Sequence, residues 1–145
     1  MKKKLELFVF GYGGMFKEIS NLILKDDLYE IIIVIENKID APSKNFNFKT
    51  ISEDIFFKNN ESNEVYVAVF IGDVKIRKTI VKLINSKLKF VVFPSFNFSK
   101  YLKSTLLHKG NIIMPGSIFT DENISIGSFN YFNFSSFIAH DIEIG

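Results

Sequence analysis

A repeat of six residues follows Pro94 and constrains the fold of this chain more than any other feature. One series is spaced by six and a second, also spaced by six, stands two residues earlier. The series are Met114, Thr120, Ile126, Phe132, Ile138, Ile144 and Ile112, Ile118, Ile124, Asn130, Ser136, Ile142. Six residues per side and three sides per coil is typical of a left-handed parallel β-helix, whose interior takes aliphatic side chains. The alternative is a set of ordinary short strands with accidental spacing.

The residues before the repeat alternate between short apolar runs and helical patterns. The runs typical of buried strands are Leu5–Phe10, Ile31–Ile35, Val65–Ile71 and Lys89–Phe93. Helical spacing predicts helices over Gly14–Lys25, Ser52–Lys58 and up to Ser86 from an N-cap at Asp73, with a loop over 37–50. This alternation predicts an α/β protein. We expect a small Rossmann-like parallel sheet domain over 1–93, a linker over 94–110 and an incomplete β-helix over 111–145.

Composition excludes several classes of protein. The 145 residues have a formal net charge of only +2, so we expect no nucleic-acid partner. There is no Cys, and the two histidines stand 32 residues apart, so no metal site is predicted. The apolar run at the N-terminus ends at Gly11, too short for a signal peptide, and no run is long enough for a membrane helix. We expect a cytoplasmic protein without membrane insertion.

The first motif that could carry chemistry is Gly11-Tyr12-Gly13-Gly14, between a predicted strand and a predicted helix. Glycines let the backbone approach a ligand closely, and a helix N-terminus offers free N–H groups to an anion. Phe16 stands where a dinucleotide fingerprint has its third glycine, which argues against NAD. Glu36, after the second strand, stands where an acidic residue often meets a ribose. The alternative is a turn that only connects strand to helix.

A second motif is Gly72-Asp73 after the third strand, with Arg77 one turn later. Ligands of open parallel sheets bind beyond the carboxyl ends of the strands, so Gly11, Glu36 and Gly72 are expected to line one crevice. Arg77 is the only Arg of the chain. It is expected to meet either a phosphate or a carboxylate on its own helix face.

The third motif is His140-Asp141, two residues after a predicted interior position of the coil. An outward imidazole on a rigid side can act as a general base near neutral pH, and a carboxylate, either from elsewhere in the fold or from Asp141 itself, can orient it. The alternative is an ordinary surface histidine. His108 lies before the repeat without an acidic neighbour and is expected to be solvated.

These pieces together resemble the bacterial sugar acetyltransferases of the NeuD/PglD type, over nearly the whole chain. The segments that carry the resemblance are Phe10–Gly14, Ile35–Asn37, Val67–Asp73 with Ile76–Lys78, Phe90–Pro94, Gly110–Gly116 and Ser136–Gly145. The last of these is the most specific, because it is similar to the segment that holds the family's catalytic histidine and a following acidic residue. Met15 and Phe93 stand where the family commonly has His.

The resemblance implies an acetyltransferase that moves acetyl from acetyl-CoA to the amino group of a UDP-type amino sugar in bacterial surface glycan biosynthesis. His140 would be the general base, and Asp141 would raise its basicity. The β-helix would trimerise and hold acetyl-CoA between adjacent copies. The implied substrate-binding residues are Gly11, Tyr12, Gly13, Gly14, Glu36, Asn37, Gly72, Asp73, Arg77 and Asn133.

Other functions remain open at this point. The chain stops at Gly145 within the repeat, so we expect a fragment that lacks most of the acetyl-CoA site, or a chain that partner chains complete. Such a chain could retain only nucleotide-sugar binding. A Rossmann-like module that binds CoA or NAD, and an O-acetyltransferase of sialic acid, are further alternatives.

Overall fold

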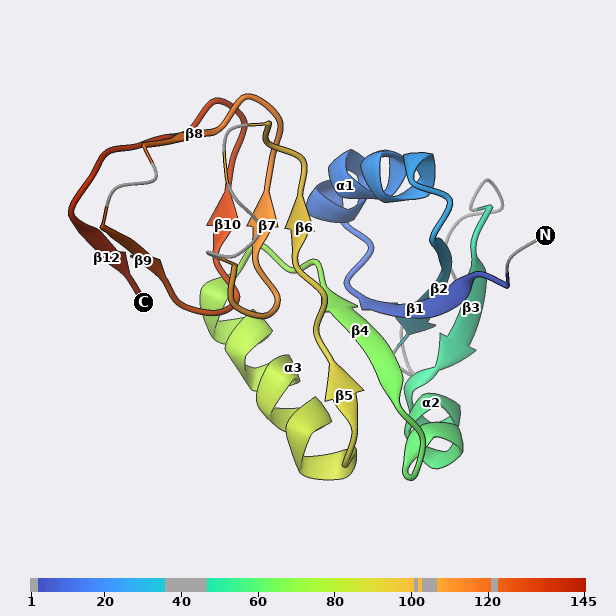
Figure 1. Ribbon diagram of the computed structural model, residues 1–145. Coiled ribbons are helices and arrows are strands. Elements are labelled where there is room, and N and C mark those ends of the chain that lie inside the picture. Colours follow the sequence, from blue (N-terminus) through green and yellow to red (C-terminus); the bar gives the residue numbers. More distant parts are fainter. Residues whose placement is uncertain (1–2, 36–46, 101, 103–106, 121–122) are drawn as a thin grey trace. The chain divides into compact units, whose positions relative to one another are not determined.

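The computed structural model describes residues 3–35, 47–100, 102, 107–120 and 123–145. The chain forms two compact units, Met1–Val92 and Phe93–Gly145 (Figure 1). No helix among the described residues is long and apolar enough to cross a membrane.

The N-terminal unit is built on a parallel sheet with the strand order β3-β2-β1-β4-β5. The strands are β1 (Leu5–Phe10), β2 (Tyr29–Ile35), β3 (Lys49–Ser52), β4 (Val65–Val69) and β5 (Val91–Val92). The helices are α1 (Gly14–Lys25), α2 (Glu53–Asn60) and α3 (Val74–Lys87). The predicted α/β class and parallel sheet are confirmed. Strand β3 was not predicted because it lies at the sheet edge and lacks the apolar run of the central strands.

Helices cover both faces of this sheet. Figure 1 shows α1 on one face and α2 and α3 on the other. Neighbouring residues of a strand point to opposite faces, and the phenylalanines of β1 point to α2. The ring of Phe56 in α2 lies 4.9 Å from that of Phe8 and 5.3 Å from that of Phe10. These buried rings and aliphatic strands form a core that holds the strand ends in place.

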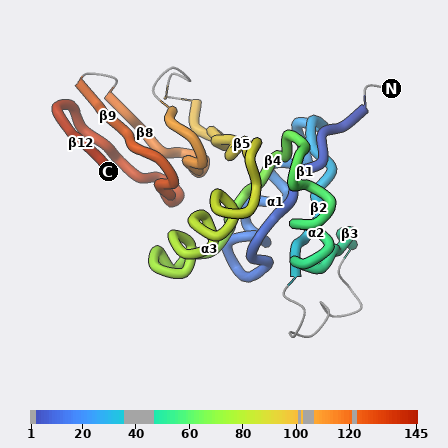
Figure 2. Tube along the Cα trace, turned by 90° about the horizontal axis from the view of Figure 1, so that it is seen from below, coloured from blue at the N-terminus to red at the C-terminus, as the bar shows by residue number. Residues whose placement is uncertain are grey.

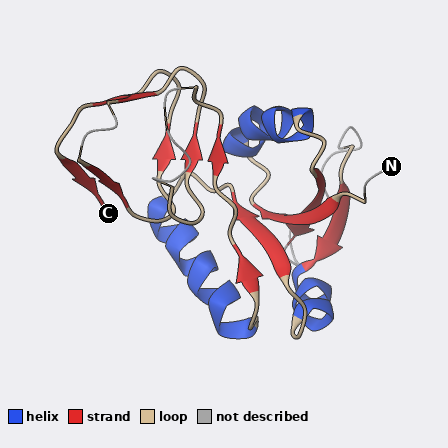
Figure 3. Ribbon diagram, in the orientation of Figure 1, coloured by secondary structure: helices blue, strands red, loops and turns tan. Residues whose placement is uncertain are grey.

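The C-terminal unit is a three-sided coil of short parallel strands. Its strands are β6 (Phe96–Asn97), β7 (Ile112–Ile113), β8 (Ile118–Phe119), β9 (Ile124–Ile126), β10 (Tyr131–Phe132), β11 (Phe137–Ile138) and β12 (Ile142–Ile144). They pair in three groups, β6-β7-β10, β8-β11 and β9-β12. Figures 1 and 2 show β9 and β12 side by side, and Figure 3 shows strands and loops but no helix in the described part of this unit. Strand β6 lies within the segment 94–110 that was expected to be a linker, and it pairs with β7 of the coil.

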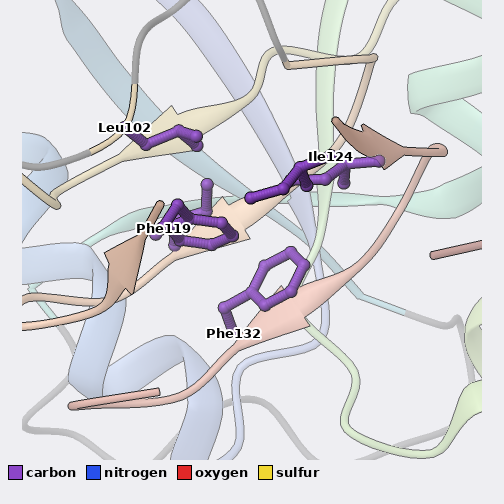
Figure 4. Close-up of a cluster of buried hydrophobic side chains, with 6 residues drawn as sticks. Leu102, Phe119, Ile124 and Phe132 are labelled. Atoms are coloured by element: carbon purple, nitrogen blue, oxygen red, sulfur yellow. The ribbon is translucent and has the colours of Figure 1, made fainter. Parts of the chain in front are cut away.

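Apolar side chains from the three sides meet inside the coil (Figure 4). They are Leu102, Ile113, Phe119, Ile124, Ile126 and Phe132, with Leu107, Ile138 and Ile144 packed against them. The rings of Phe119 and Phe132 are 5.1 Å apart and meet edge to face. Aromatic rings therefore fill part of the interior of the coil.

The predicted interior positions before Ile124 are wrong by one residue, whereas Ile124 and Ile126 lie in the interior as predicted. Strand pairing aligns Ile113 with Phe132 and Phe119 with Ile138. Thr120 is accordingly exposed, as is Ile118 with 40% exposure. The reason is that four residues separate β8 from β9, whereas three separate β11 from β12. The extra residue shifts the register of every position before it.

Residues with positive φ turn the chain at the corners of the coil. The pairs that stack between successive coils are Gly110 (φ 70°) with Phe129 (φ 64°), Gly116 (φ 79°) with Ser135 (φ 56°), and Asn123 (φ 50°) with Asp141 (φ 56°). Asn and Asp tolerate this conformation better than most residues. The last of the three corners therefore combines a tight turn with two polar side chains.

Candidate functional site

Gly11 ends β1 at the point where the strand order reverses. Phe70 N donates to Phe10 O at 2.8 Å, which holds the end of β4 against β1. Gly11 has a φ of +90°, and a Cβ there would lie 2.6 Å from Ile71 Cγ1 and 2.8 Å from Phe70 O. Only glycine fits at this position without displacing the backbone of Phe70. The switch point of an open parallel sheet is the usual place for a ligand.

Gly13 and Gly14 have a different environment from Gly11. A Cβ on either would meet no atom of the described residues within 4 Å, so these residues do not require glycine there. Among the described residues no side chain caps the N-terminus of α1 at Gly13, and the first turn has no acidic residue. The N–H groups of the first turn of a helix and the positive end of its dipole suit an anion such as a phosphate.

A small cavity of about 160 Å³ lies beside this turn. Its lining consists of Phe10, Gly11, Tyr12, Val34, Glu53, Ile71 and Ile80. Sequence reasoning missed Glu53, although its position directly after β3 places it at the same sheet edge as Gly11. A larger cavity of about 390 Å³ lies at the opposite edge, beside Leu5 at the start of β1. Because ligands of such sheets bind at the carboxyl ends, we place the site at the smaller cavity.

Asp73 and Arg77 make hydrogen bonds beside Ile71, which lines this cavity. Asp73 Oδ1 accepts from Lys75 N at 2.8 Å and from Ile76 N at 3.0 Å, so the predicted N-cap is confirmed. Arg77 Nη1 donates to Ile71 O at 2.7 Å, a partner that the sequence did not predict. Burial lowers the pKa of the Arg77 guanidinium, while the Asp73 carboxylate opposes the shift. The pair thus fixes the loop that carries Ile71 and Gly72.

The other predicted substrate-binding residues have different outcomes. Tyr12 lines the cavity, whereas Glu36 and Asn37 lie outside the described residues. Asn133 is a corner residue of the coil. Its Oδ1 accepts from Phe134 N at 2.8 Å, and its backbone oxygen accepts from Ser117 Oγ at 3.0 Å. These bonds tie Asn133 to the architecture of the coil.

His140 and Asp141 lie at the third corner of the coil. His140 Nδ1 is 2.6 Å from Asp141 Oδ2, and Asn123 Nδ2 donates to Asp141 Oδ1 at 2.8 Å. The side chains of His140 and Asp141 are 63% and 61% exposed. Sequence reasoning missed Asn123, although it stands 18 residues before Asp141, which is one turn of the coil. When Nδ1 carries the proton toward Asp141, Nε2 is left as an accessible base.

The hydrogen bonds to Asp141 favour its ionised form. The bond from Asn123, followed by that from His140, lowers the pKa of the Asp141 carboxyl below its usual value, against a smaller opposing effect of desolvation. A lowered pKa in the folded state means that this stabilisation is present above the ordinary pKa of the carboxyl and is lost as the pH falls through the lowered value. Asp141 is therefore a carboxylate at neutral pH.

Replacement of Asn123 with glycine is expected to raise the pKa of Asp141. Glycine keeps the positive φ of 50° without strain and removes the donor to the carboxylate. The pKa can be measured by NMR titration of the side-chain carboxyl carbon. Replacement of Asn133 with glycine, at another corner, serves as the control. An Asp141 pKa that stays the same in the Asn123 variant would show that this bond does not stabilise the carboxylate.

Two comparisons with known proteins give matches, one to a family model and one to solved structures. The family model described as the PglD N-terminal domain matches residues 6–84. The acetyltransferase domain of PglB from Neisseria gonorrhoeae FA1090 in complex with acetyl coenzyme A is similar in structure, with a TM-score of 0.77 and 18% identity over 97% of this chain and 67% of that one. A second structure of this domain gives a TM-score of 0.70 and 19% identity over 95% and 66%. The chain thus spans about two thirds of their length. No curated protein matches the sequence.

Proposed function

Since the chain belongs to the PglD N-terminal domain family, we propose that it transfers acetyl from acetyl-CoA to the amino group of a nucleotide-linked amino sugar in bacterial surface glycan biosynthesis. The observation that carries the proposal is the 2.6 Å pairing of His140 with Asp141. It lies on a chain whose fold resembles an acetyltransferase domain that was solved with acetyl coenzyme A.

His140 acts as the general base in this proposal. Its Nε2 takes a proton from the sugar amine as the amine nitrogen attacks the thioester carbonyl carbon. The new C–N bond forms, the C–S bond breaks, and the proton passes to the leaving thiolate to give free CoA. Asp141 orients the ring through Nδ1 and stabilises the imidazolium, and Asn123 keeps Asp141 ionised.

The N-terminal unit binds the nucleotide part of the substrate in this proposal. Gly13 and Gly14 leave space beside the bare N-terminus of α1, where the diphosphate sits. The cavity beside Gly11 and Tyr12 takes a further part of the ligand.

A homotrimer through a left-handed coil completes the proposal. Ile118 of β8 lies opposite Phe137 of β11, and the two are 40% and 67% exposed on one side of the coil. Phe134, also exposed, stands three residues before the start of β11. Such a contiguous apolar surface is typical of an interface between copies. Analytical ultracentrifugation that finds only monomers at micromolar concentration would contradict this part of the proposal.

A thiol-release assay tests the activity directly. The chain is mixed with acetyl-CoA and a nucleotide-linked 4-amino sugar, and free CoA is followed with a chromogenic disulfide. CoA release that depends on the amino sugar, with formation of the acetamido sugar by mass spectrometry, is the expected result. Release no faster than in the absence of protein would overturn the proposed activity of this chain.

A further inference from the structure

Helix α3 concentrates the positive charge of the chain. Its sequence, Val74–Lys87, contains four lysines and one arginine and no acidic residue. The helix therefore carries a formal charge of +5, and because the whole chain carries +2, all other residues together carry −3. The small net charge of the protein thus conceals one strongly basic element.

Three of the lysines form an exposed face of α3, which we call the basic face. The inward side of the helix is marked by Ile84, which is fully buried, and by the half-buried Ile80. Lys75, Lys78 and Lys82, spaced by three and four residues, lie on the opposite side and are exposed. No ion pair joins any of the three to an acidic residue in the part of the chain that the structure describes. Like charges at these spacings repel one another, so an anionic partner would relieve this repulsion.

Apolar side chains border the basic face at the start of α3. Val74 is 64% and Ile76 53% exposed, and each is next to Lys75 in the sequence. Consecutive residues of a helix are about 100° apart around its axis, so the two apolar side chains stand on either side of this lysine. A soluble polyanion offers only charge to such a surface. A lipid surface offers anionic headgroups together with an acyl region that takes up apolar side chains.

We propose that the basic face of α3 docks the protein on an anionic phospholipid surface. The lysines contact the headgroup phosphates, and Val74 and Ile76 enter the boundary between headgroups and acyl chains. Because the lysines occupy the middle of the face and the apolar side chains its borders, electrostatic attraction supplies most of the affinity. The helix lies along the surface, since its 14 residues are fewer than the roughly 20 that span a bilayer. This docking is independent of the proposed acetyl transfer.

Sedimentation with lipid vesicles tests the docking. The full chain is mixed with vesicles of phosphatidylglycerol and phosphatidylcholine in equal amounts, or with vesicles of phosphatidylcholine alone. Binding to the anionic vesicles only is the expected result. It should weaken as the ionic strength rises from about 0.01 M to about 0.1 M, because the Debye length falls from about 30 Å to about 10 Å. Failure to bind the anionic vesicles at low salt, or equal binding to both kinds, would overturn the proposal.

A variant with all three lysines of the basic face replaced by glutamine tests the location of the docking surface. It is expected to bind the anionic vesicles roughly 100-fold more weakly, about fivefold for each lysine. The matched control removes the same charge from three lysines that are exposed on α1 and α2, Lys17, Lys25 and Lys58. It should bind within about threefold of the wild type, and circular dichroism checks that both variants fold. An equal loss in the two variants would overturn the assignment to α3.

The double variant Val74→Ser, Ile76→Ser separates a lipid surface from an acidic macromolecule. It keeps every lysine and is expected to weaken vesicle binding by about fivefold or more, because apolar surface is no longer buried in the lipid. Its binding to poly-glutamate, a probe that offers charge alone, should equal that of the wild type. Unchanged vesicle binding in the folded double variant would assign the basic face to an acidic macromolecule and overturn the lipid proposal.

Discussion

Replacement of His140 with alanine is expected to lower the rate of acetyl transfer by roughly 10²- to 10⁴-fold, the usual contribution of a general base. The side chain is 63% exposed and lies outside the apolar cluster of the coil, so the variant should fold like the wild type. The thiol-release assay measures the rate, and circular dichroism checks the fold. The loss should fall on kcat, because the proton is transferred in the transition state and not on binding.

His108 is the control for this prediction, since it is the only other histidine and is also exposed. Its contacts with Ser95 and Asn111 use its backbone oxygen, which alanine retains, so His108→Ala should keep the wild-type rate. Asp141→Asn tolerates the positive φ of 56° and removes the charge. It should give an intermediate rate and an altered pH profile. Wild-type activity in His140→Ala would eliminate this residue as the base.

Replacement of Gly11 with alanine is expected to lower the free energy of unfolding by roughly 2–5 kcal/mol, the sum of left-handed backbone strain and overpacking. Its Cβ would lie within 2.8 Å of Phe70 O, a backbone atom held by the bond between Phe70 N and Phe10 O. Relief of the clash would separate the ends of β1 and β4. Urea denaturation measures the loss, and nucleotide affinity should fall with it.

Gly14→Ala is the matched control, because a Cβ at this position meets nothing within 4 Å and alanine favours the first turn of a helix. Its unfolding free energy should be equal to or slightly above that of the wild type. Its nucleotide affinity should nevertheless fall, since the methyl group takes the space proposed for the diphosphate. A Gly11→Ala variant as stable as Gly14→Ala would contradict the steric argument for Gly11.

Local patterns predicted much of the N-terminal unit correctly. The apolar runs identified β1, β2 and β4, and Asp73 was identified as an N-cap that the structure confirms with two hydrogen bonds. The partner of Arg77 could not be predicted, because Ile71 O reaches it only through the loop that follows β4. The position of Glu53 at the cavity could not be predicted either. Its relation to Gly11 depends on how strands distant in sequence are ordered in the sheet.

The period of six by itself determined that the C-terminal segment forms a three-sided coil, because each side buries apolar residues at a regular spacing. It could not determine which residues before Ile124 face inward, since one extra residue between β8 and β9 shifts the register. The pairing of His140 with Asp141 was predictable from their adjacency. Only the tertiary structure added Asn123, because a contact across one turn of the coil depends on strand register and corner conformation.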